Sequence, residues 1–439
     1  MGGAVLGIVV VVVIIVAALA GYFAASANVS TTTTTNTSII TTTLPGTTNT
    51  VTSTATSTET LEVTGTVTNT LTNTITSTNT LTTTNVVTTT TTATASCPTL
   101  PAPGSSSLPT PSSPIAEAGS SLLAPLFALW QANFTASYPN VHVNTAAGGS
   151  GAGQTGVEQN TLNLGGSDVF ATSAQAATYP GILNIPVAIS AQQVNYNIPG
   201  LTHQLNLTGN ILAGIYNGTI TYWDNAAIVK ANPLAASQLP HQAIVPIHRS
   251  DSSGDTGLFT TYLSDTSPSW QKNVGSGTTV QWPSDPAAQS ASGNSGMLTA
   301  ASQTQYSIAY IGVSYLAQAN TAGLGNAKLL NLAGNFVALT PANVGTAVNN
   351  QYTSTPANER VSLIYGPGAT AYPIVNYEYV WVQQTQSSAT LATDIQALLT
   401  WATSPTYGNS AYFLNQVGFV PLPSTVLSLT CAQVDSITG

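Results

Sequence analysis

The sequence predicts an α/β protein preceded by a long low-complexity segment. From Ile115 onward, short apolar runs alternate with helical patterns across small polar turns, which is the strand–turn–helix rhythm of α/β folds. Residues 28–114, in contrast, consist largely of Thr, Ser and Pro. At 439 residues the chain is long enough for two folded domains beside this segment.

Charged side chains make up only 4% of the chain, which has five Lys and Arg, fourteen Asp and Glu, and a net charge of −9 at pH 7. Soluble domains typically contain roughly 25% charged residues. Binding to nucleic acid or to an anionic membrane surface relies on Lys and Arg, because these side chains displace counterions. The composition therefore argues against both as partners.

Residues 1–27 carry no charged side chain, and residues 5–20 are almost continuously apolar. With its flanks, this run approaches the roughly 20 residues that span a bilayer. We interpret it as an uncleaved N-terminal membrane anchor, because the basic region of a signal peptide is missing. A signal peptide with Ala25-Ser26-Ala27 as its cleavage site is the alternative. In both cases we expect the rest of the chain to be exported and to lie at the outer face of the cell membrane.

The low-complexity segment, residues 28–114, has a period of two. Between Thr50 and Thr84, Thr occupies the even positions except at Glu62. This period, built from β-branched residues, indicates an extended backbone. We interpret the segment as a glycosylated stalk; a strand that pairs with another copy of the chain is the alternative. N-glycosylation sequons begin at Asn28, Asn36, Asn133, Asn206 and Asn217.

The folded region begins near Ile115. Strands or extended segments are predicted at residues 115–119, 141–143, 186–199, 243–247, 307–313 and 377–383. Helices are predicted after a cap at Ser120 or Ser121, from Ser150 through Val157, and over residues 258–263.

Two cysteines, Cys97 and Cys431, flank the folded region. In an exported protein we expect them to form a disulfide that ties its two ends together, and two free thiols are the alternative. The sequence has no C-x-x-C motif and no Cys/His cluster with zinc spacing, so it predicts neither a metal site nor a cofactor.

Four stretches share one design, a turn of small or hydroxyl residues before a helix. The stretches are Gly119–Leu122, Gly148–Gly151, Ser167-Asp168 and Arg249–Thr256. Helix N-termini present free backbone N–H groups and favour negative charge. One of the few cations, Arg249, stands beside such a turn. Taken together, the stretches predict an oxyanion cage, whereas each alone is also typical of a plain helix cap.

These stretches, in this order, resemble the PstS-type phosphate-binding proteins of phosphate ABC transporters. The resemblance runs from about Ile115 to Leu427. Its other matching stretches are Asn197–Leu201, Ile220–Asp224, Asn273–Gly277 with Trp282, and Ile308–Tyr310. The resemblance implies a two-domain, hinged periplasmic-binding-protein fold of type II, with phosphate in the cleft. Domain I would comprise residues 115–195 plus 374–439 and domain II residues 196–373, with crossovers near Tyr196 and Ile374.

The resemblance also implies the phosphate-binding residues, and it assigns Asp251 to hold Arg249 in place. The phosphate-binding residues would be Ser121, Leu122, Ser150, Asp168, Arg249, Ser253, Gly254, Asp255 and Thr256. The family often has an aromatic residue at the position of Leu122. A hydroxyl residue commonly stands where this chain has Asp255.

The carboxylate of Asp255 changes what the site could accept. If it points inward, it repels phosphate unless a proton lies between them, and the site would then require a protonated oxyanion and reject sulfate. The alternative is that Asp255 caps the helix or pairs with Arg249.

We therefore expect an extracellular substrate-binding protein that captures inorganic phosphate and delivers it to the membrane permease of an ABC transporter. The alternative is a structural or adhesive surface protein that keeps the same fold and uses the glycosylated stalk. An enzyme such as a phosphatase is not expected, because the four His residues are scattered and no metal-ligand cluster is evident.

Overall fold

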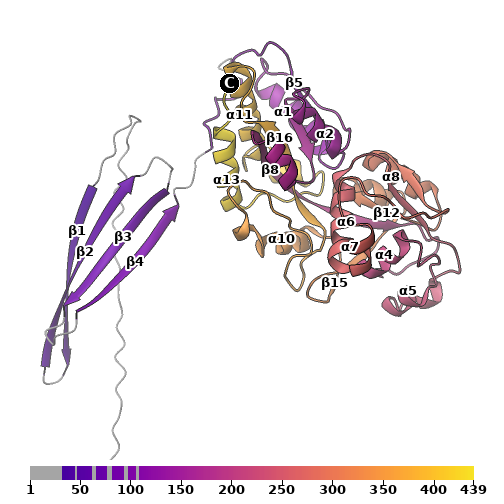
Figure 1. The fold of residues 1–439 in the computed structure, drawn as a ribbon, viewed down its shortest axis with the longest axis horizontal. Coiled ribbons are helices and arrows are strands. Elements are labelled where there is room, and N and C mark those ends of the chain that lie inside the picture. The colour runs from indigo at the N-terminus through magenta and orange to yellow at the C-terminus, as the bar shows by residue number, and fades with distance from the viewer. Residues whose placement is uncertain (1–31, 45–46, 62–65, 77–81, 93–96, 105–107) are drawn as a thin grey trace, which may run out of the picture. The chain divides into compact units, whose positions relative to one another are not determined.

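The computed structural model describes residues 32–44, 47–61, 66–76, 82–92, 97–104 and 108–439 (Figure 1). The chain forms two compact units, Met1–Ala93 and Thr94–Gly439. The predicted anchor lies outside the described residues. Within those residues, no helix combines the length and apolar character that crossing a bilayer requires.

The first unit contains an antiparallel sheet in the order β1-β2-β3-β4 (Figure 1). Its strands are β1 (Thr32–Leu44), β2 (Thr47–Leu61), β3 (Thr66–Thr76) and β4 (Thr82–Thr92). The extended backbone agrees with the period of two in the sequence, and each strand pairs with the next segment of the same chain. A role as a stalk stays a prediction.

The second unit is built on a mixed sheet of nine strands in the order β11-β10-β12-β8-β16-β7-β5-β6, with β13 also paired to β8. Its strands are β5 (Ile115–Gly119), β6 (Val143–Asn144), β7 (Leu164–Ser167), β8 (Ile182–Tyr196), β10 (Val245–Arg249), β11 (Gln289–Ala291), β12 (Ser307–Gly312), β13 (Gly325–Asn326) and β16 (Val375–Gln383). A small separate sheet consists of β9 (Asn206–Leu207), β14 (Lys328–Leu330) and β15 (Phe336–Val337).

Strand β8 joins two halves of the large sheet. Its residues 182–191 pair with β16, whereas residues 192–196 pair with β12. We call β16, β7, β5 and β6 the first half, and β12, β10, β11 and β13 the second half. β8 ends at Tyr196 and β16 begins at Val375. The crossovers near Tyr196 and Ile374 and the domain boundaries stay predictions.

Helices pack on both halves of the sheet. α2 contacts β5 and β7, α6 and α8 contact β12, and α13 contacts β8. The helices are α1 (Ala124–Ser137), α2 (Ser150–Glu158), α3 (Ser173–Thr178), α4 (Gly209–Tyr216), α5 (Ala226–Ala231), α6 (Gly254–Thr266), α7 (Pro268–Asn273), α8 (Gly293–Gln303), α9 (Leu316–Thr321), α10 (Pro341–Asn349), α11 (Ala389–Thr403), α12 (Ala411–Leu414) and α13 (Ser424–Asp435). Short 3₁₀ turns lie at Ala236–Gln238, Val313–Tyr315 and Tyr352–Ser354.

Two predicted helix starts were wrong. The first helix is predicted after a cap at Ser120 or Ser121, but α1 begins at Ala124 with Leu123 at the N-cap and no side-chain cap. The reason is that the Ser120 hydroxyl serves the turn before the helix, where it accepts from the N–H groups of Leu122 and Leu123.

The sequence places the helix after the Arg249 turn at residues 258–263, but α6 begins at Gly254. The reason is a helix cap, since the Ser253 hydroxyl accepts a hydrogen bond from the backbone N–H of Thr256. Gly254, Asp255 and Thr256 therefore form the first helical turn, where free N–H groups point outward.

The predicted disulfide between Cys97 and Cys431 is confirmed. It joins the segment that enters the second unit to α13, across a sequence separation of 334 residues.

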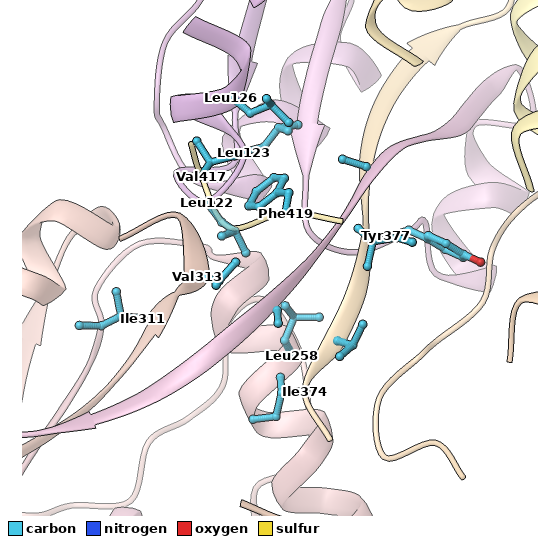
Figure 2. Close-up of a cluster of buried hydrophobic side chains, with 14 of the residues drawn as sticks. Leu122, Leu123, Leu126, Leu258, Ile311, Val313, Ile374, Tyr377, Val417 and Phe419 are labelled. Atoms are coloured by element: carbon cyan, nitrogen blue, oxygen red, sulfur yellow. The ribbon is translucent and has the colours of Figure 1, made fainter. Parts of the chain in front are cut away.

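Apolar side chains from both halves meet beside β8 (Figure 2). Leu122, just before α1, packs so closely against the end of β12 that a Cβ on Gly312 would lie 2.4 Å from Leu122 Cδ1. The neighbouring buried side chains are Leu123, Leu126, Leu258, Ile311, Val313, Ile374, Tyr377, Val417 and Phe419. This cluster holds the halves together next to the predicted cage.

Candidate functional site

The predicted cage residues come together in the second unit, at the ends of strands and the starts of helices. Arg249 ends β10, Ser253 caps α6, Ser150 begins α2 and Asp168 follows β7 directly. All predicted binding residues are buried; Arg249 is only 3% exposed and Asp168 only 1%. The backbone N–H of Gly151 donates to the carbonyl of Ser252 at 3.1 Å, so the two halves touch here.

Arg249 is held by two carboxylates. Its Nε donates to Oδ1 of Asp251 at 2.7 Å, and its Nη2 donates to Oδ2 of the same residue. Nη1 donates to Oδ2 of Asp255 at 2.8 Å. The predicted support of Arg249 by Asp251 is thus present. A guanidinium has five N–H donors, so one N–H on each Nη is left for a bidentate contact with an oxyanion.

Asp255 takes the second of the two roles that the sequence left open, because it pairs with Arg249. Its carboxylate also accepts hydrogen bonds from Nε2 of Gln192 at 3.1 Å and from Nδ2 of Asn294 at 2.6 Å. Burial raises the pKa of Asp255, while the charge of Arg249 and these donors act in the opposite direction. With this many donors directed at it, we take Asp255 to be an ionised member of the scaffold.

Asp168 faces a second buried acid, Glu378 of β16. Oδ1 of Asp168 accepts a hydrogen bond from the Ser120 hydroxyl, and its carboxyl group lies within hydrogen-bonding reach of Glu378. Burial raises the pKa of both acids, and repulsion raises them further, from Asp255 for Asp168 and from Asp168 for Glu378. The contact between the two acids raises the pKa of Glu378 and lowers that of Asp168, so we assign the proton to Glu378, whose O–H donates a hydrogen bond to Asp168.

Ser121 and Leu122 lie before α1. Two groups of Asn294, the backbone N–H and Nδ2, donate to the hydroxyl oxygen of Ser121, each at 3.0 Å. The N–H of Leu122 donates to Oγ of Ser120 at 3.1 Å, so in this structure it serves the local turn. The side chain of Leu122 lies in the apolar cluster, which explains how an aliphatic residue can replace an aromatic one.

Ser150 and Gly254 bring the two halves into close contact beside Asp168. Oγ of Ser150 accepts a hydrogen bond from the N–H of Asp168 at 3.2 Å. A Cβ on Gly254 would lie 2.4 Å from Oδ2 of Asp168 and 2.5 Å from Oγ of Ser150, so only glycine fits at this point. The remaining predicted residue, Thr256, hydrogen-bonds through its hydroxyl to Tyr310 at 2.8 Å.

Three site residues were not found from the sequence, namely Gln192, Asn294 and Glu378. Asn294 follows Ser292-Gly293 at the start of α8, which is the same turn design as in the four predicted stretches, so a signal was present. The other two lie within the buried strands β8 and β16. Within a buried strand, a polar residue does not reveal which distant neighbour it contacts.

The charges of the site favour an oxyanion that carries a proton. Around the single cation Arg249 stand the carboxyl groups of Asp251, Asp255 and Asp168. A fully deprotonated anion would add repulsion, whereas a P–OH or similar group could donate to Asp168. Among the described residues, no cluster of His, Cys, Asp and Glu is arranged to hold a metal ion.

The mixed sheet and the buried donors between its halves are typical of a protein that encloses a small anion. Over residues 52–406 the chain matches the family model described as a PBP superfamily domain. The phosphate-binding protein PstS of Methanocaldococcus jannaschii is 33% identical to it over 325 residues, which cover 70% of this chain and 82% of that protein. PstS of Pasteurella multocida is 31% identical over 327 residues, which cover 74% of this chain and 91% of that protein.

The chain belongs to the PstS family of phosphate-binding proteins, within the PBP superfamily. The same fold occurs in the solved structure of a high-affinity periplasmic phosphate-binding protein, PfluDING, with bound phosphate. The TM-score is 0.58 at 22% identity, and the match covers 72% of this chain and 92% of that one. This family consists of substrate-binding proteins, as the sequence led us to expect.

Proposed function

We propose that this chain captures inorganic phosphate between the two halves of its large sheet and delivers it to the permease of an ABC transporter, without catalysing a reaction. The observation that carries the proposal is the buried Arg249. Asp251 and Asp255 fix its guanidinium and leave one N–H on each Nη for an oxyanion. The named function of the PstS relatives supports phosphate as that anion.

The ligand groups in this proposal are those of the predicted cage, except for the N–H of Leu122, which donates to Ser120 in the local turn. Arg249 grips two oxygens, and Ser121, Ser150 and Ser253 direct hydroxyl groups to the others. The first-turn N–H groups of Gly254 and Asp255 add donors at the positive end of the α6 dipole, whereas the N–H of Thr256 donates to the Ser253 cap. Asp168 accepts a hydrogen bond from the protonated oxygen of the bound phosphate, and Asp255 contributes indirectly by fixing Arg249.

The N-terminal segments would keep this site at the outer face of the membrane. We propose residues 1–27 as the anchor and residues 28–114 as a glycosylated spacer, supported by the uncharged apolar run and by the Thr-rich composition. Domain I (115–195 plus 374–439) and domain II (196–373) would move about β8 to admit the anion.

The selectivity for phosphate over sulfate, compared between the wild type and a variant of Asp168, tests this proposal. Wild-type protein should prefer phosphate over sulfate, because sulfate has no proton to give to a buried acceptor. In Asp168→Asn the new amide can donate to a sulfate oxygen, so the phosphate-to-sulfate affinity ratio should fall by about tenfold or more. Competitive titration with both anions measures the ratio. Asp265→Asn, an exposed position on α6, is the control and should keep it. An unchanged ratio in Asp168→Asn would remove Asp168 from the site.

A further inference from the structure

The N-terminus of α8 supplies a wall of the site that the family resemblance did not assign. Asn294 is fully buried there, and each polar atom of its side chain has a partner. Its Nδ2 donates to Ser121 at 3.0 Å and to Asp255 at 2.6 Å, while its Oδ1 accepts the N–H of Gly312 at 2.7 Å. Asn294 therefore links the second half of the sheet to Ser121 of the first.

These contacts decide whether the Ser121 hydroxyl can donate or accept a further hydrogen bond. A hydroxyl oxygen has two lone pairs and one proton. The backbone N–H and Nδ2 of Asn294 occupy both lone pairs, so Ser121 can only donate. Its proton is left for a third partner, which in the closed site is the oxyanion.

The same side chain also covers the carboxylate of Asp255. Oδ2 of Asp255 accepts from Nη1 of Arg249 at 2.8 Å and from Nδ2 of Asn294. With two donors on that oxygen, no lone pair remains there for an approaching anion. Ser121 Oγ and Asp255 Oδ2 are thus removed as competing acceptors, while Oδ1 of Asp255 accepts from Nε2 of Gln192 at 3.1 Å. Asp168 remains the acceptor that we assign to the anion.

We propose that Asn294 is a positioning residue for anion specificity: by donating to Ser121 Oγ and Asp255 Oδ2, it turns Ser121 into an obligate donor and masks Asp255, so that the site accepts a phosphate with one protonated oxygen facing Asp168. This inference rests on the proposed phosphate-binding function. It accounts for the presence of Asp255, since a masked carboxylate can lie close to a bound anion.

A double-mutant cycle on the full chain tests this role, with inorganic phosphate as the probe in calorimetric titration. Asn294→Ala should weaken binding by about tenfold or more, because it frees two acceptors beside the anion. In the Ser121→Ala background, where one of these acceptors is gone, the same change should cost clearly less. Replacing Asp255 by Asn together with Asn294→Ala should recover part of the affinity, because the unmasked carboxylate is then absent.

The controls separate positioning from folding. Asn331→Ala removes another buried asparagine, whose Nδ2 donates to the carbonyls of Gly368, Ala369 and Ala371, and should leave phosphate affinity unchanged. Asn294→Asp keeps the shape of the side chain and the acceptor for Gly312 but loses the donor, so it should bind phosphate at least as poorly as Asn294→Ala. Thermal unfolding establishes that each variant is folded.

Two results would overturn the inference while the proposed function stands: equal effects of Asn294→Ala with and without Ser121, or wild-type affinity in Asn294→Asp. If the unmodified chain fails to bind phosphate, the proposed function and this inference fall together. Phosphate binding by the wild type, together with strongly non-additive effects of Ser121→Ala and Asn294→Ala, supports both the proposed function and this inference.

Discussion

Replacing Arg249 by Ala should weaken phosphate binding by at least about 2 kcal/mol, which is roughly a thirtyfold loss of affinity. The guanidinium is the cation of the cage, and its charge-assisted hydrogen bonds to a buried anion have no substitute among the neighbouring groups. Isothermal titration with phosphate measures the effect. Lys230→Ala, which removes an exposed cation in the last turn of α5, is the control for the change in net charge.

The Arg249 variant also leaves Asp251 and Asp255 without their partner, and this affects folding as well as binding. Breaking a buried ion pair by removing one member typically destabilises a protein by about 3–5 kcal/mol. Arg249→Ala combined with Asp255→Asn should therefore unfold at a higher temperature than Arg249→Ala alone and still bind phosphate poorly. Wild-type affinity in a folded Arg249→Ala variant would refute the assignment of the site.

The free energy of unfolding should be higher at pH 5 than at pH 8.5, by at least about 3 kcal/mol. Glu117 and Glu359 are buried carboxyl groups, and burial raises the pKa of each from 4.5 to about 8. Between about pH 4.5 and pH 8, the folded protein keeps protons on these two carboxyl groups that the unfolded chain has released. Stability is therefore complete below about pH 4.5 and is lost as the pH rises toward 8.

Denaturant unfolding at a series of pH values measures this dependence. Glu117→Gln and Glu359→Gln keep a neutral side chain of the same shape at every pH. Each should therefore reduce the slope of the free energy of unfolding against pH. At the acidic end, stability should decline only where Asp251 begins to bind protons, because Arg249 holds the pKa of Asp251 below its usual value despite its partial burial. A free energy of unfolding that increases from pH 5 to pH 8.5 would show that these acids are not buried as described.

The α/β class, the disulfide and the main site segments could be predicted because each has a local signal. Apolar runs mark β10, β12 and β16, and the turns at Ser120-Ser121 and Arg249–Thr256 combine small residues with a following helix. The start of α6 could not be placed, because the Ser253 cap competes with other hydroxyl residues in the same turn. Propensity alone does not choose among Ser250, Ser252 and Ser253.

The role of Asp255 could not be decided from the sequence, because it depends on residues that are distant along the chain. Gln192 approaches from β8, 63 residues away, and Asn294 approaches from α8, 39 residues away. Only the packed fold shows that both donate to this carboxylate. The same holds for Glu378, which reaches Asp168 across 210 positions of sequence (378 − 168). Such pairs are set by tertiary contacts and leave no local pattern.

The most direct test of phosphate capture is a calorimetric titration of the purified chain with inorganic phosphate, repeated in the presence of a large excess of sulfate. We expect saturable binding at micromolar phosphate, and we expect sulfate to leave it almost unchanged because it cannot donate a proton to Asp168. No binding at these concentrations, or equal competition by sulfate, would contradict the account of a cage built around Arg249 and Asp168.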